Sequence, residues 1–190
     1  MTNKVNIRKA CKVIGKTLVF RDVEIGDADF ILSLRCDPRK SRYISRTDCD
    51  THKQIKWIEE YGRRIDEAYF VIESKTGDSL GTVRIYDPVG MSFSWGSWML
   101  KCGSPRHAAI ESALMVYDYA INYLGFEESH FDVRKGNERV WKFHERFGAV
   151  RTGETDLDFF YKISVAEIEA SIEKYERYLP GGVEVVWYSD

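Results

Sequence analysis

The segment at residues 130–149 constrains the fold more than any other part of this chain. Residues 130–133 (His-Phe-Asp-Val) are typical of a short strand, residues 134–136 (Arg-Lys-Gly) of a basic turn, and Asn137 can cap a helix. One face of that helix carries four side chains at spacings of three and four: Val140, Phe143, His144 and Phe147. Gly148 supplies a helix end before the next strand-like run. The pattern therefore indicates an amphipathic helix placed between two strands.

Composition limits the class of protein. The chain has 190 residues, enough for one domain with a sizeable core, and 44% of them are hydrophobic. The formal net charge of −2 gives no reason to expect a nucleic-acid or acidic-membrane partner. No apolar run approaches the length of a membrane span, and the start lacks the apolar core of a signal peptide.

The four cysteines, Cys11, Cys36, Cys49 and Cys102, form no C-x-x-C pair. This spacing gives no zinc or redox signature, and no histidine pair has the spacing of metal ligands, so we expect no metal. These observations predict a cytoplasmic protein whose thiols are reduced.

Local patterns predict most of the secondary structure. Strands are expected at residues 17–23, 68–73, 80–86, 91–100, 130–133, 149–154, 157–163 and 183–188. Helices are expected at residues 27–35, 51–65, 105–124, 137–147 and 165–178, with Asp27, Thr51 and Ser104 as possible N-caps. Residues 1–15 read as a tail or a poorly paired strand and residues 39–50 as a loop.

The order of these elements indicates an α/β (α+β) layered domain. The three strands between residues 68 and 100 form a meander, which favours a largely antiparallel sheet, and Gly96 can mark a bulge in the third strand. The long connection through residues 105–124 is able to join two parallel neighbours, 91–100 and 130–133.

This arrangement resembles the GCN5-related N-acetyltransferase (GNAT) family, whose closing motif is N-x-x-A-x-x-[FL]-Y-x-K-x-G-F. The resemblance covers residues 15–163. It implies a mixed, mostly antiparallel sheet with splayed central strands and helices on both faces. Residues 164–190 would form a C-terminal helix and strand that pack on the same domain, either capping the sheet or forming a homodimer contact.

The resemblance implies acetyl-CoA as cosubstrate. The pantetheine arm would lie between strands 91–100 and 130–133, and the pyrophosphate at the start of the next helix. The residues implied in this site are Trp98, Leu100, Gly103, Ser104, Arg106, His107, Ala108, Asn137, Arg139 and Phe143. The loop departs from the family pattern because Pro105 and His107 stand where glycines are usual, and Pro105 removes one amide donor.

His144 falls where many family members carry the tyrosine that protonates departing coenzyme A. It is the candidate proton donor, with a pKa expected near the operating pH, and the alternative is a half-buried structural residue. Asp132 is the candidate catalytic base, with Glu73 and Asp87 as further possibilities. His52 and His130 read as structural or surface residues.

A branch of the family that acetylates nucleotide-linked amino sugars, as in pseudaminic-acid-type pathways, is similar at residues 34–38, 68–72 and 154–161. The substrate residues implied are Arg35, Arg39, Arg42, Tyr43 and Glu73. Clustered arginines suit a nucleotide diphosphate. Trp57 and Tyr61 are candidates to stack on a base, or are core residues.

The leading hypothesis is therefore an acetyl-CoA-dependent N-acetyltransferase in which a small-molecule primary amine attacks the thioester directly. A protein or peptide N-terminal acetyltransferase of ribosomal-protein type is one alternative. A non-catalytic acyl-CoA-binding module is another, favoured by the altered glycine loop. A thiol enzyme using Cys102 is the third, because a helix N-terminus lowers a thiol pKa.

Overall fold

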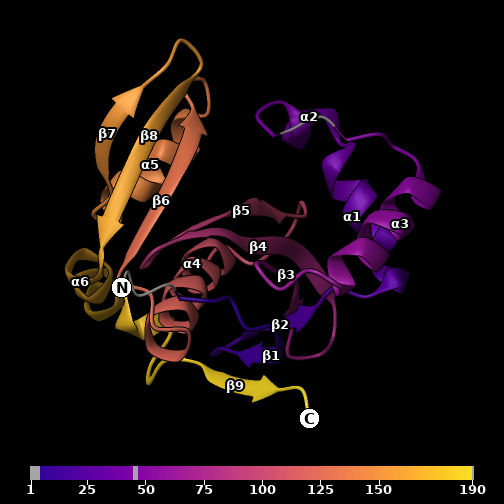
Figure 1. The fold of residues 1–190 in the computed structure, drawn as a ribbon, viewed down its shortest axis with the longest axis horizontal. Coiled ribbons are helices and arrows are strands. Elements are labelled where there is room, and N and C mark those ends of the chain that lie inside the picture. Colours follow the sequence, from indigo (N-terminus) through magenta and orange to yellow (C-terminus); the bar gives the residue numbers. More distant parts are fainter. Residues whose placement is uncertain (1–4, 45–46, 190) are drawn as a thin grey trace.

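The computed structural model describes residues 5–44 and 47–189. Within them, one nine-stranded sheet has the strand order β7-β8-β6-β5-β4-β3-β2-β1-β9 (Figure 1). The strands are β1 (Ala10–Ile14), β2 (Leu18–Asp22), β3 (Ala68–Ser74), β4 (Ser79–Val89), β5 (Ser92–Leu100), β6 (Glu128–Arg134), β7 (Val150–Glu154), β8 (Asp158–Ser164) and β9 (Glu184–Trp187).

The helices are α1 (Ala28–Arg35), α2 (Pro38–Ser41), α3 (Thr51–Gly62), α4 (Ala108–Asp118), α5 (Glu138–Arg146) and α6 (Val165–Lys174). A π-helical turn, Tyr119–Tyr123, extends α4, and 3-10 turns lie at Ile25–Asp27 and Glu176–Tyr178. The expected α/β (α+β) fold class is confirmed.

Helices cover both faces of the sheet, and each face has its own core. On one face, the apolar side chains of α4 and α6 pack with alternate residues of the strands, among them Phe70, Val83 and Phe93. On the other face, α1 and α3 pack with Tyr69 and Val71 of β3. Because successive strand residues point to opposite faces, the uninterrupted buried run of β3 serves both cores.

The sheet opens between its two central strands. All its strand pairs are antiparallel except β5 and β6, which are parallel and pair only at Ser92–Glu128 and Phe93–Ser129. Beyond these residues the two strands carry no further paired positions, so they separate toward their carboxyl ends. The splayed central strands expected from the sequence are confirmed.

The first and last strands of the chain pair at one edge of the sheet. β1 was expected to be a tail or a poorly paired strand, but it pairs with β2 on one side and with β9 on the other. A local reading misses this pairing because the partner strand comes from the last residues of the chain. The helix α6 also packs on the domain, since the Ser171 hydroxyl donates to the carbonyl of Phe147.

Three local expectations were wrong. Residues 39–50 are not entirely loop, because α2 begins at Pro38, although residues 45–46 lie outside the described part. The side chain of Asp50, not that of Thr51, accepts the amides of α3. Ser104 does not cap α4, because its hydroxyl donates to the carbonyl of Leu80 (3.3 Å).

Candidate active site

A bulge in β5 lies where the sheet opens. Ser97, directly after Gly96, has a positive φ of 47°, and the β4–β5 register shifts at this point. Thr82 holds the bulge from β4 by donating to the Ser97 carbonyl (2.8 Å). As a result Trp95 and Trp98, three residues apart, turn to the same face with ring centroids 5.3 Å apart. The irregularity expected at Gly96 is therefore present.

His144 of α5 lies across the opening and touches both strands. Its ring centroid is 4.3 Å from that of Phe131 on β6 and 5.2 Å from that of Trp95 on β5. The side chain is buried, with 5% of the residue exposed, and Nδ1 has no hydrogen-bond partner among the described residues. Burial lowers the pKa of His144 to about 3, so the ring is neutral at physiological pH. The expected pKa near neutrality was wrong.

Asp132 lies on the opposite face of β6, in the part that has separated from β5. Phe131 and Val133 are buried toward α5, so the alternation of the strand turns Asp132 the other way. Partial burial, followed by the charge of Asp158, raises the pKa of Asp132. On β4 the Tyr86 hydroxyl reaches the same region, because it lies 3.0 Å from where a Cβ on Gly96 would be.

The other carboxylates considered as bases are engaged elsewhere. Glu73 forms an ion pair with Arg21 (2.9 Å). Asp87 contacts Nε2 of His130 (3.2 Å), whose Nδ1 is 2.7 Å from the Ser92 hydroxyl. Of the three candidates, Asp132 is therefore the one placed on the separated part of the opening.

The loop expected to hold the pyrophosphate connects β5 to α4. Gly103 adopts a left-handed conformation (φ 84°), and Arg106 is exposed. The amide of Ala108 is already used, because it donates to the Pro105 carbonyl (2.9 Å). His107 occupies the N-cap position, and its Nε2 lies 2.9 Å from the Thr17 hydroxyl. The His107 ring is thus tied to Thr17, just before β2, and Lys101 and Arg106 are exposed cations of this loop.

The remaining residues expected to bind the cofactor lie on β5 and α5 or at the start of α5. Phe143 packs on Trp98, with ring centroids 5.1 Å apart, and Leu100 ends β5. Asn137 is the N-cap residue of α5, although its side chain makes no cap hydrogen bond. Arg139 is exposed and lines a shallow hollow along α5 with Lys142, Glu145 and Arg146.

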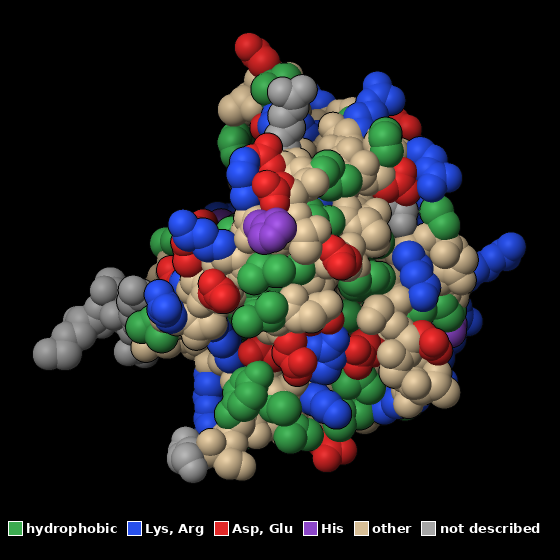
Figure 2. Space-filling model, turned by 90° about the vertical axis from the view of Figure 1, so that its right-hand side faces the viewer, with side chains coloured by type: hydrophobic (Ala, Val, Ile, Leu, Met, Phe, Trp, Pro, Cys, Tyr) green, Lys and Arg blue, Asp and Glu red, His purple; other side chains and the backbone are tan. Residues whose placement is uncertain are grey.

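A pocket of about 310 Å³ lies on the α1 and α3 side of the sheet and extends to the β5 bulge. It is lined by Arg35, Thr47, Gln54, Trp57, Tyr69, Arg84 and Ser97. Two of these residues carry guanidinium groups and none carries a carboxylate. The buried carboxylate of Glu67 holds Arg84 and also Arg64 (2.8 Å). Figure 2 shows acidic and basic side chains mixed over the face that lies on the right-hand side of Figure 1.

The pocket contains one of the five residues that the sequence suggested for the substrate, Arg35. Arg39 is exposed and pairs with Asp37 (3.0 Å), while the guanidinium of Arg42 lies 5.3 Å from the centroid of the Tyr43 ring. Glu73 lies outside the pocket, in the ion pair described above. Trp57 was weighed as a substrate residue, and it lines the pocket.

Sequence reasoning missed five pocket residues: Thr47, Gln54, Tyr69, Arg84 and Ser97. One signal was present for Arg84, a charged residue between the buried apolar residues Val83 and Ile85 of β4. The others come from separate elements that only the folded chain brings together.

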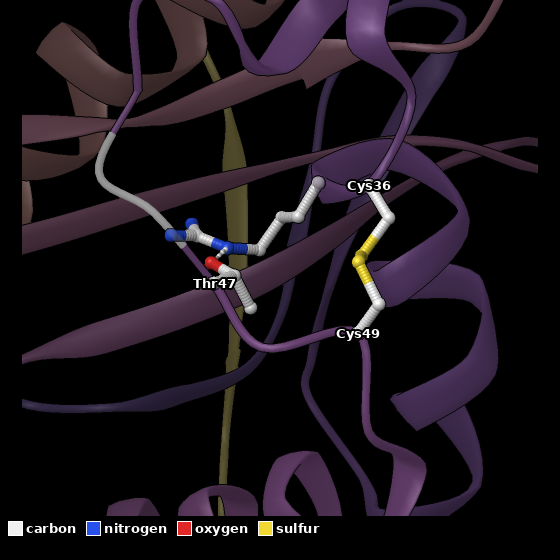
Figure 3. The surroundings of a disulfide bond; sticks show 4 residues. Cys36, Thr47 and Cys49 are labelled. Carbon is white, nitrogen blue, oxygen red and sulfur yellow. Dashed lines mark hydrogen bonds between the residues drawn. A yellow bond between two sulfur atoms is a disulfide. The ribbon is translucent and has the colours of Figure 1, made fainter.

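A disulfide between Cys36 and Cys49 lies beside Thr47, a residue of the pocket lining (Figure 3). It joins the end of α1 to the segment before α3. Beside it, Nε of Arg35 donates to the Thr47 hydroxyl (2.5 Å). The expectation of reduced thiols was therefore wrong for these two cysteines, which lie 13 positions apart without a recognisable motif. Cys11 and Cys102 are free.

A family model described as "Acetyltransferase (GNAT) domain" matches residues 17–150. The chain belongs to the GNAT acetyltransferase family. No curated protein matches it. Among solved structures, it is similar to apo FdhC, described as a nucleotide-linked sugar GNAT, with 37% identity and a TM-score of 0.79. That match covers 88% of this chain and 98% of FdhC. The family expected from the closing motif is confirmed, and so is the expectation that the chain is an acetyltransferase.

Two more distant GNAT structures share the fold. A GCN5-related N-acetyltransferase from Brucella melitensis has 17% identity and a TM-score of 0.76, covering 93% of this chain and 90% of its own. The spermidine N-acetyltransferase from Vibrio cholerae, solved with CoA and spermine, has 18% identity and a TM-score of 0.69, covering 80% and 98%. Within residues 5–44 and 47–189, no helix has the length and apolar character that crossing a membrane requires.

Proposed function

We propose that this GNAT protein transfers the acetyl group of acetyl-CoA to the amino group of a nucleotide-linked amino sugar. The observation that carries the proposal is the 37% identity to FdhC over nearly the whole of both chains. The spermidine N-acetyltransferases, at 17–18% identity, support the fold and not their substrate.

The charge of the pocket favours this acceptor over a polyamine. Arg35 and Arg84 line it without a carboxylate among the other lining residues. Guanidinium groups suit the diphosphate of a sugar nucleotide, whereas a polycationic acceptor finds no carboxylate among the lining residues. The pocket extends to Ser97, so an acceptor inside it has access to the β5 bulge.

The opening between β5 and β6 is the proposed site of the thioester. Where two paired strands separate, their amides lose partners and are able to donate to a carbonyl oxygen, which polarises it. Trp98 and Phe143 offer an apolar wall for the pantetheine arm. Gly103 and Arg106, at the start of α4, are proposed to meet the pyrophosphate.

The chemistry requires a free amine and a proton for the thiolate. In the proposed mechanism the amine attacks the thioester carbonyl, and Asp132 takes the proton that the nitrogen then loses. The raised pKa of Asp132 improves its strength as a base. His144 begins neutral, so it donates an N–H hydrogen bond to the departing sulfur rather than acting as an imidazolium acid. The thiolate leaves as an anion and takes its proton from solvent water, so the products are the N-acetylated sugar nucleotide and CoA.

Steady-state kinetics with acetyl-CoA tests the proposal, using release of CoA thiol as the readout. We expect turnover with at least one nucleotide-linked amino sugar and none with spermidine or with N-terminal peptides. Turnover of peptides alone would support the ribosomal-protein type of acetyltransferase. Calorimetric binding of acetyl-CoA without turnover of any amine would support a non-catalytic binding module.

Substitution of His144 tests the site. His144→Phe keeps the aromatic contacts, and we expect a large fall in kcat with little change in the Kd of acetyl-CoA. An unchanged kcat would remove His144 from the mechanism. Cys102→Ala serves as the matched control, and wild-type turnover in that variant would exclude the thiol-enzyme alternative.

A further inference from the structure

Two polar side chains of the pocket have no structural partner. Gln54 of α3 is 7% exposed and Tyr69 of β3 is 2% exposed, and both line the pocket. In the described part of the chain, the Tyr69 hydroxyl is buried without a hydrogen bond, although burial raises its pKa and the nearby Thr82 side chain lowers it. The Gln54 amide lines the pocket and makes no hydrogen bond to the described residues. A buried polar group without a partner costs free energy of folding. The buried Tyr69 hydroxyl, next to a second polar lining residue, Gln54, therefore indicates that a ligand rather than the fold uses these groups.

The neighbouring polar side chains do make hydrogen bonds within the protein, so a missing hydrogen bond is not a general feature of this core. Next to Tyr69 in the same core, the Tyr61 hydroxyl donates to Asp22 (2.5 Å) and accepts the amide of Tyr69 (2.9 Å). Thr82 uses its proton on the carbonyl of Ser97. Among these described neighbours, the Tyr69 hydroxyl is thus the buried group without a hydrogen bond, and it borders the cavity.

We propose that Gln54 and Tyr69 are specificity-determining residues that hydrogen bond the oxygen substituents of the acceptor's sugar ring. This inference rests on the proposed function. A volume of about 310 Å³ accommodates one sugar ring with an attached phosphate. Arg35 and Arg84 hold the phosphate from two sides of the same cavity, and the amino group extends toward Ser97 and the opening. A neutral amide and a phenol suit hydroxyl groups, which donate and accept.

The pair also explains how the site would reject a polyamine. The aliphatic chain of a polyamine has no oxygen atom that could hydrogen bond to the Gln54 amide or the Tyr69 hydroxyl. Both groups would therefore stay unpaired in a complex from which water is excluded. Sites built to hydrogen bond a substrate group discriminate strongly against analogues that lack it, because the buried partners are left unsatisfied. This effect acts together with the lack of a carboxylate among the lining residues.

Two isosteric variants, Tyr69→Phe and Gln54→Leu, test the proposal. Because the removed groups have no partner in the free protein, the midpoint of thermal unfolding should stay the same or rise. The KM for the sugar-nucleotide acceptor should rise roughly tenfold in each variant, the effect of about one lost hydrogen bond to a ligand. The KM for acetyl-CoA should not change, since the donor lies at the opening.

Tyr117→Phe is the matched control. The Tyr117 hydroxyl is also buried without a hydrogen bond in the described chain, but it lies on the other face of the sheet, among Phe93, Trp95 and Phe147. Its loss should leave the acceptor KM unchanged. A tenfold rise in the control as well would show a general packing effect and would overturn the proposal.

The failures of the two proposals are distinguishable. If the wild-type enzyme acetylates a sugar nucleotide and both pocket variants retain its KM, the specificity role is wrong and the proposed function stands. A lower unfolding midpoint in Tyr69→Phe would also overturn it, because the hydroxyl would then be structural. If no sugar nucleotide is acetylated by the wild-type enzyme, both proposals fail together.

Discussion

The ring of Tyr43 fills the space in which a side chain at Gly136 would lie, with its Cε1 2.9 Å from the ideal Cβ position. Tyr43 follows α2, and Gly136 is in the turn between β6 and α5. This contact therefore joins the segment after α1 to the far side of the opened sheet. It depends on the absence of a side chain at residue 136.

Gly136→Val should displace Tyr43 and weaken acceptor binding. The new methyl groups overlap the ring, and overpacking of this kind costs about 1–3 kcal/mol unless the neighbour moves. We expect a higher KM for the acceptor, measured by steady-state kinetics. In a Tyr43→Ala background the same substitution should have little further effect, whereas equal effects in both backgrounds would show that the contact is irrelevant.

Glu111→Gln should destabilise the fold. The Glu111 carboxylate is fully buried in α4 and accepts three hydrogen bonds from the start of β2, from the amides of Thr17 (2.6 Å) and Leu18 (2.9 Å) and the Thr17 hydroxyl (2.6 Å). An amide cannot accept all three, so we expect a loss of about 1–3 kcal/mol in urea unfolding. Glu169→Gln, on the exposed face of α6, should have no measurable effect.

The stability of the wild-type protein should fall with acidification more steeply than that of His144→Phe. The pKa of His144 is about 3 in the folded state and about 6.5 when unfolded, so below pH 6.5 the unfolded chain binds the extra proton. This difference removes about 2 kcal/mol between pH 6.5 and pH 5. Urea unfolding of both proteins at the two pH values measures it. Parallel losses would show that the imidazole is solvated.

The disulfide predicts a specific thiol count. In denaturant without reductant, two of the four cysteines should react with a thiol reagent, and all four after reduction. Four reactive thiols before reduction would show that Cys36 and Cys49 are not joined.

Removing the disulfide should loosen the edge of the pocket. The disulfide closes a loop between residues that are 13 positions apart, which restricts the unfolded chain. The double variant Cys36→Ser, Cys49→Ser should therefore lower the free energy of unfolding by about 3 kcal/mol. Because Arg35 and Thr47 lie beside the bond, the acceptor KM should rise too. Cys102→Ser, at an exposed free thiol, is the control and should match the wild-type protein in both measurements.

The sequence by itself determined most of the elements and their order. Helical periodicity identified α5, and the long connection before β6 indicated the parallel pair, because these patterns follow from local geometry and chain length. The family motif placed His144 on α5. The motif carried no information on what surrounds the His144 ring. The expected pKa was wrong because the ring is buried against Phe131 of β6 and Trp95 of β5.

Only the tertiary structure decided what lies around the site. The pocket draws Arg35, Gln54, Tyr69, Arg84 and Ser97 from α1, α3, β3, β4 and β5, elements that no sequence spacing relates. The pairing of β1 with β9 and the bond between Cys36 and Cys49 are likewise contacts between distant positions. Propensity and periodicity act over a few residues, whereas cavities, ion pairs and pKa values depend on neighbours that the fold alone supplies.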